Sequence, residues 1–63
     1  MQVTFDRSVA SSIMEAGYSY TPTGNSTIAV DFDSDQDIYD ALADAGLDHI
    51  ADSVIYTNYY EIN

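Results

Sequence analysis

Residues 26–46 read STIAVDFDSDQDIYDALADAG, and this stretch predicts a strand followed by a helix. From Ser26 onward polar and apolar residues alternate, which is typical of a half-buried strand. The apolar side of this strand would be Ile28, Val30 and Phe32. Ser34 is then a good N-cap, Asp37 completes a pattern similar to a capping box, and Gly46 ends the predicted helix. The apolar stripe of that helix is Ile38, Ala41, Leu42 and Ala45.

The rest of the chain predicts one further helix and three further strands. The strands are expected at 2–5, 18–21 and about 53–62, with a turn at 22–25 and a helix between Asp6 and Gly17. The order βαββαβ indicates an α+β fold. We expect a single domain over residues 1–63, a small ferredoxin-like sandwich with two helices on one face of an antiparallel sheet.

The charge balance excludes several classes of function. The 63 residues include 11 Asp or Glu and 1 Lys or Arg, for a formal net charge of −10, and there is no cysteine. Nucleic acids and anionic membranes are bound by clusters of Lys and Arg, so neither is an expected ligand. Without an apolar run of about 20 residues or a signal-peptide pattern, we expect a cytoplasmic protein.

The acidic residues are concentrated in one segment, because eight of the nine aspartates lie between positions 31 and 52. Asp37, Asp40 and Asp44 are three and four residues apart, which places them on one face of the predicted helix. Asp48 continues the spacing but lies beyond Gly46, and Tyr39 is expected to flank Asp40. The candidate partner-binding residues are Asp31, Asp33, Asp35, Asp37, Tyr39, Asp40, Asp44 and Asp48.

Such an aspartate series opposes folding locally. Each like-charge pair four residues apart costs about 0.2–0.5 kcal/mol, and acids near the C-terminal end of a helix oppose its dipole. A face that is merely solvated would carry Glu and Lys pairs, yet the chain has no lysine. We therefore expect the acidic ridge to be a binding surface of a monomer, with a basic, nucleic-acid-binding protein as its partner.

Other chemistry finds little support in the sequence. Residues 31–35, DFDSD, begin like an EF-hand loop, but Gln36 stands where Gly is required and Leu42 where Glu is required. Weak binding of a divalent ion by the clustered aspartates stays open. His49 is the only histidine and is expected to be a structural or surface residue. No nucleophile–base pattern is present, so we expect no enzyme, no cofactor and no dedicated metal site.

In size, charge and aspartate spacing the chain resembles small phage-encoded DNA-mimic inhibitors, especially anti-CRISPR proteins acting on type I (I-C-like) systems. The resemblance implies a non-enzymatic inhibitor that occupies the DNA-binding surface of a Cas effector subunit in the host cytoplasm. The near absence of Glu from the ridge departs from many such mimics. Two alternatives remain, namely a small domain adapted to high salt and an acidic antitoxin or regulatory subunit with a dedicated basic partner.

Overall fold

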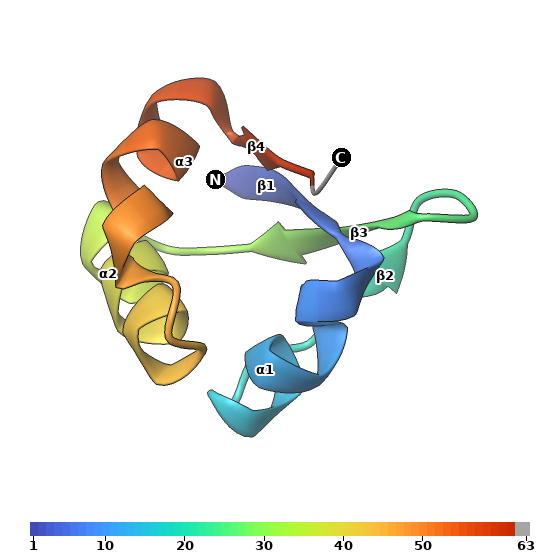
Figure 1. Cartoon of the computed structure of the whole chain (residues 1–63), viewed down its shortest axis with the longest axis horizontal. Coiled ribbons are helices and arrows are strands. Elements are labelled where there is room, and N and C mark those ends of the chain that lie inside the picture. Colours follow the sequence, from blue (N-terminus) through green and yellow to red (C-terminus); the bar gives the residue numbers. More distant parts are fainter. Residues whose placement is uncertain (62–63) are drawn as a thin grey trace.

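Two five-residue strands form the centre of the sheet in the computed structural model, which describes residues 1–61 (Figure 1). β1 (Gln2–Asp6) and β3 (Thr27–Asp31) run antiparallel. Their register places Val3 opposite Val30 and Phe5 opposite Ile28. All four side chains are at most 1% exposed, so the apolar faces predicted for these strands are confirmed.

The two outer strands are short and differ in direction. β2 (Thr21–Pro22) pairs antiparallel with β3, and β4 (Tyr59–Tyr60) pairs parallel with β1. The order across the sheet is β2-β3-β1-β4. The α+β class is therefore confirmed, but the sheet is mixed, and the prediction of a fully antiparallel sheet is wrong at β4.

The helical elements in the described residues are η1 (Arg7–Val9), α1 (Ala10–Glu15), α2 (Asp35–Asp44), η2 (Asp48–Ile50) and α3 (Ala51–Thr57). Both predicted caps are present. The Asp6 carboxylate accepts from the Ser8 N–H at 3.0 Å, and the Ser34 hydroxyl accepts from the Asp37 N–H at 3.4 Å. Gly17 and Gly46 follow the two predicted helices with φ of +94° and +73°, a conformation that glycine adopts without strain.

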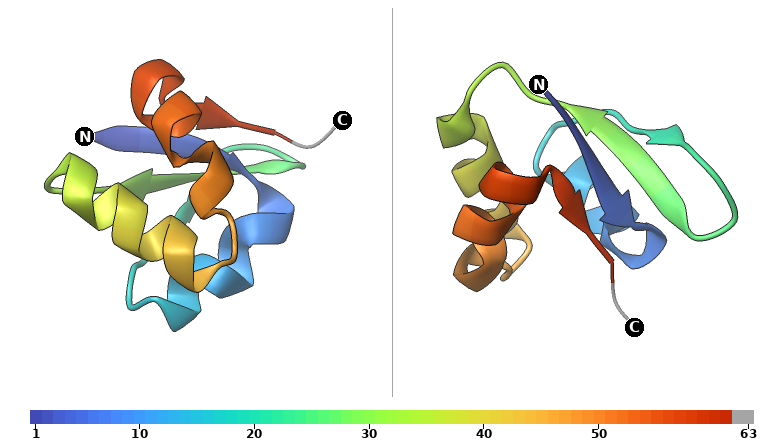
Figure 2. Two further views of the ribbon diagram at one scale, coloured as in Figure 1. Left: turned by 60° about the vertical axis from the view of Figure 1, so that its left-hand side comes forward. Right: turned by 90° about the horizontal axis from the view of Figure 1, so that it is seen from above.

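All three α-helices bury side chains against the same face of the sheet (Figure 2). Ile13 from α1, Leu42 from α2 and Val54 from α3 join the inward side chains of β1 and β3 in one hydrophobic cluster. The predicted placement of helices on one face is confirmed, but residues 1–61 form three α-helices rather than two. The element order is thus βαββααβ, not the βαββαβ of a ferredoxin-like sandwich.

The predicted last strand, 53–62, is wrong over most of its length. Residues up to Thr57 belong to α3, only Tyr59 and Tyr60 form a strand, and Ile62 lies outside the described residues. Ala51 and Val54 are buried one helical turn apart, and this burial outweighs the strand preference of Val, Ile and Tyr. One connecting helix would have made the last strand antiparallel to β1, whereas α3 reverses the chain once more (Figure 1).

The predicted strand 18–21 is displaced toward the hairpin turn. Pairing with β3 begins only at Thr21 and includes Pro22, which had been assigned to the turn. The Tyr18 N–H donates to the Ile13 carbonyl at 3.1 Å, so the chain stays attached to the end of α1 before it enters the sheet. Proline fits an outer strand because its missing N–H removes no necessary ladder bond there.

Candidate functional site

The aspartate stripe is positioned by the buried side of α2. Ile38, Ala41 and Leu42 are 0% exposed and hold the helix against the core, which turns the opposite side outward. Asp37, Asp40 and Asp44 follow one another at intervals of three and four residues, about one helical turn each, and so share one face on this outward side. Asp40 and Asp44 are exposed and Asp37 is half-buried. The stripe predicted from sequence is therefore present along one helix.

The other four predicted acids do not continue the stripe as one line along α2. Asp31 is the last residue of β3 and faces away from the helices, opposite Gln2. Asp33 lies in the loop before α2, and Asp35 is the first residue of that helix. Asp48 opens η2, beyond Gly46, as expected. All four are exposed, so the structure gathers three of the seven predicted aspartates into a stripe and spreads the rest.

One group of carboxylates surrounds the phenol of Tyr18, in the segment after α1. Burial raises the pKa of Tyr18, and the charges of Asp37 and Asp40, with a smaller contribution from Asp33, raise it further. The Tyr18 ring packs on Phe32 with ring centroids 5.1 Å apart. Tyr18 is thus packed on the core between α1 and the acidic side of α2.

A second group lies on the other side of α2, around Tyr39. The Tyr39 hydroxyl donates to the Asp52 carboxylate on α3. This hydrogen bond raises the pKa of Tyr39, and burial together with the charges of Asp52 and Asp35 raises it further. Tyr39 flanks Asp40 along α2, but its hydroxyl bonds to Asp52, and Asp40 accepts from the Gln36 amide at 3.1 Å.

Asp52 is absent from the predicted site because it lies between the predicted helix, which ends at Gly46, and the predicted strand 53–62, where no helical spacing relates it to α2. On α3 it lies four residues before Tyr56, on the same helix face, and Tyr56 is 89% exposed. The apolar spacing of Ala51, Val54 and Ile55 was the signal for a helix that would have placed Asp52 beside α2.

The stripe has no neutralising arginine or lysine. Arg7, the only such residue in the sequence, donates from Nη1 to the Asn25 carbonyl at 3.5 Å. Within residues 1–61, no three carboxylate or imidazole side chains converge closely enough to hold a metal ion. The surface consequently carries uncompensated negative charge in a fixed geometry, which favours recognition of positive charge.

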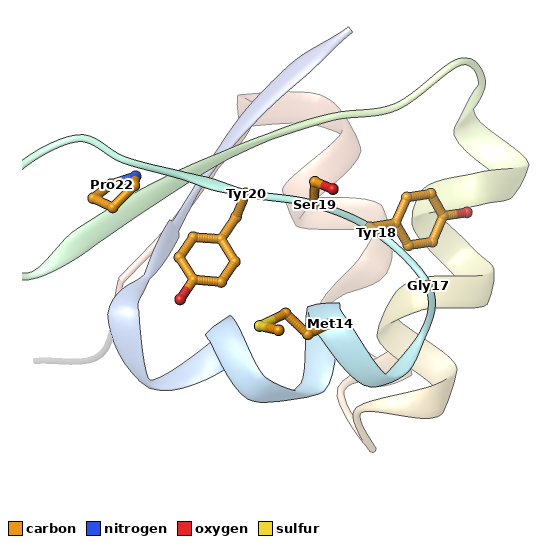
Figure 3. A pocket seen from close by; sticks show the side chains of 6 residues that line it. All are labelled: Met14, Gly17, Tyr18, Ser19, Tyr20 and Pro22. Carbon is orange, nitrogen blue, oxygen red and sulfur yellow. The ribbon is translucent and has the colours of Figure 1, made fainter.

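An open groove of about 570 Å³ lies beside the stripe, between α1 and the segment that leads into β2 (Figure 3). Its lining is Met14, Gly17, Tyr18, Ser19, Tyr20 and Pro22. None of these side chains is an acid, a histidine or a lysine, so the lining offers no paired nucleophile and base. The sequence alone does not indicate this groove, because its shape depends on the turn of the backbone at Gly17 after α1.

Comparison of this chain with known protein families, curated proteins and solved structures finds no match. Among the helices of residues 1–61, none combines the length and apolar character needed to cross a membrane.

Proposed function

We propose that this protein is a non-enzymatic inhibitor whose acidic surface imitates the charge of DNA and occupies a basic DNA-binding surface of a host defence protein. The observation that supports the proposal is the uncompensated stripe of Asp37, Asp40 and Asp44 on α2. The proposed partner is a Cas effector subunit, from the resemblance in size, charge and aspartate spacing to anti-CRISPR proteins.

The spacing of the charges is suited to this role. Residues 37 and 44 are about 10.5 Å apart along the helix axis at 1.5 Å per residue, and three carboxylates lie within that length. One strand of B-DNA presents a phosphate about every 3.4 Å along its axis. Three Arg or Lys side chains arranged for phosphates therefore meet a comparable density of negative charge on α2.

The energetic cost of the stripe also supports a binding role. Asp35 and Asp37 interact favourably with the N-terminal end of the α2 dipole, whereas Asp44, at the C-terminal end, opposes it. Asp40 and Asp44 repel each other at a spacing of four residues. A solvated surface does not need this arrangement, and a surface that binds positive charge does.

The proposal is tested by competition with DNA on a purified type I CRISPR surveillance complex. The complex is loaded with a fluorescent DNA duplex, and displacement of the duplex by the protein is measured. The test variant is Asp40→Asn with Asp44→Asn. The matched control is Glu15→Gln with Glu61→Gln, which removes the same amount of charge outside α2. We expect the test variant to compete at least tenfold less well, since close interfacial charge pairs contribute about 1.5 kcal/mol or more.

Three results would count against this function. Failure of the unaltered protein to displace DNA overturns the proposed partner. Equal losses in both double variants show that only net charge matters, not its placement on α2. If the protein folds only at about 1 M salt or more, adaptation to high salt is favoured. At that concentration the Debye length is about 3 Å, so repulsion between charges that lie farther apart is largely screened.

A further inference from the structure

The groove beside α1 is an apolar surface that the fold leaves uncovered. The Met14 side chain from α1 and the Tyr20 ring from the opposite segment approach each other across it, and Pro22 lies at one end (Figure 3). Met14 is 60% exposed. Flexible methionine side chains adapt to differently shaped apolar partners and are common on binding surfaces. The groove is thus suited to accept an apolar side chain.

The groove stays open because of how the chain leaves α1. Gly17, with φ of +94°, turns the backbone, and the Tyr18 N–H then bonds to the Ile13 carbonyl. The chain pairs with β3 only from Thr21, so Ser19 and Tyr20 belong neither to α1 nor to the sheet. The opening therefore follows from the path of the backbone after α1, with the Met14 and Tyr20 side chains as its facing walls.

One end of the groove meets the acidic surface. Tyr18 lines the groove, and its ring is directed toward α2 (Figure 3). Asp37 and Asp40 on α2, with Asp33 before it, are the carboxylates that act on this phenol. An apolar surface without any charged lining residue is thereby placed next to a concentration of negative charge. The complementary ligand has an apolar side chain and a positive charge close together.

We propose that the groove between α1 and residues 17–22 binds a segment of the basic partner in which a leucine-like side chain adjoins an arginine or lysine. The apolar side chain lies between Met14 and Tyr20, and the cation pairs with Asp37 or Asp40. This inference rests on the proposed function, because it takes the basic partner from it. It adds a contact that salt does not screen, which charge imitation alone lacks.

Two short peptides of equal charge test the inference. They are acetyl-Gly-Arg-Leu-Arg-Gly-amide and acetyl-Gly-Arg-Gly-Arg-Gly-amide, each titrated into ¹⁵N-labelled protein at low salt and followed by NMR. We expect the leucine peptide to bind about tenfold more tightly, from burial of one leucine side chain. Both peptides should shift the amides of Asp37 and Asp40, and only the leucine peptide should shift those of Met14, Gly17 and Ser19.

A pair of variants assigns the preference to the groove. Met14→Gln replaces one uncharged side chain with another of similar length but makes the groove wall polar. It should lower the affinity for the leucine peptide to that for the glycine peptide. Ser11→Gln, at an exposed position of α1 outside the groove lining, should retain the tenfold preference. Because Met14 is exposed, the fold should be unaffected, which circular dichroism checks.

Each contrary result has a distinct meaning. Equal affinities of the two peptides, with chemical-shift changes confined to Asp37 and Asp40, overturn the proposed binding role of the groove and leave the proposed function intact. Absence of shifts at Asp37 and Asp40 with either peptide overturns both. Shifts at Met14 and Ser19 that grow with protein concentration alone assign the groove to a second copy of this chain, which also overturns the inference.

Discussion

Replacing Asp44 with lysine is expected to stabilise the fold, because aspartate is electrostatically unfavourable at this position. Asp44 is exposed and is the last residue of α2, where the helix dipole is negative. It also follows Asp40 by four residues, so two like charges share a helix face. Lysine reverses the sign of both interactions.

Three contributions give the expected magnitude. Replacing the Asp40–Asp44 repulsion with an attractive pair contributes about 0.4–1 kcal/mol. Reversing the interaction with the helix dipole contributes about 0.5–1 kcal/mol at an exposed site. The higher helix propensity of lysine adds about 0.3 kcal/mol. The free energy of unfolding should therefore rise by about 1–2 kcal/mol at low salt, while the binding surface loses one of its charges.

Glu15→Lys is the matched control for this change. Glu15 is likewise exposed and ends its helix, α1, but the residues three and four positions before it are Ser12 and Ser11. The control therefore reverses a dipole interaction without removing a like-charge pair within its helix. Its expected gain is about 0.5–1 kcal/mol, smaller than that of Asp44→Lys.

Urea unfolding followed by circular dichroism measures both variants, with the midpoint and the slope fitted separately. The measurements are made at about 50 mM and about 1 M salt, where the Debye length falls to about 3 Å. The advantage of Asp44→Lys over Glu15→Lys should shrink at the higher salt. A loss of stability in Asp44→Lys, or a gain no larger than that of the control at low salt, would refute the proposed repulsion within the stripe.

Two further predictions concern pH and the end of α2. The hydrogen bond to Asp52 raises the pKa of Tyr39 above its ordinary value of 10.0, so above about pH 10 the unfolded chain loses its phenolic protons first and the free energy of unfolding decreases. Urea unfolding at about pH 9 and about pH 11 measures this loss of unfolding free energy, which should be smaller in Tyr39→Phe. An unchanged loss would contradict the role assigned to the Tyr39 phenol. Gly46→Ala should lower stability by about 1 kcal/mol, because the backbone at this position has φ of +73°, which alanine adopts only with strain. A steric clash is not the cause, since the added Cβ meets no atom within 4 Å. The control Gly24→Ala places its Cβ an ordinary 3.6 Å from Thr27 Oγ1, and an equal loss in both variants, measured by urea unfolding, would show that φ is not the cause.

The central elements were predictable because their signals are local. The alternation in β3 and the spacing of Ile38, Ala41 and Leu42 in α2 each reflect one buried face, and both were confirmed. The caps at Asp6 and Ser34 were equally local, since each bonds to a backbone N–H two or three residues away. Element boundaries beyond these signals were less secure, as the displaced β2 shows.

The C-terminal segment was mispredicted because two local signals conflict there. Val, Ile and Tyr favour a strand, whereas the positions of Ala51 and Val54 favour a helix. Burial of both residues against the core decides for the helix, and this energy is absent from any local measure of propensity. The added helix then brings β4 alongside β1 in the parallel direction.

The net charge and the stripe on α2 could both be predicted from the amino-acid sequence, because helical spacing places Asp37, Asp40 and Asp44 on one face. What lies next to those three charges depends on tertiary packing. The Tyr39–Asp52 bond joins two different helices, and Tyr18 comes to lie near Asp37 and Asp40 from a segment well before them in the chain. Packing around a common core brings such segments together, and the periodicity of neither segment contains that information.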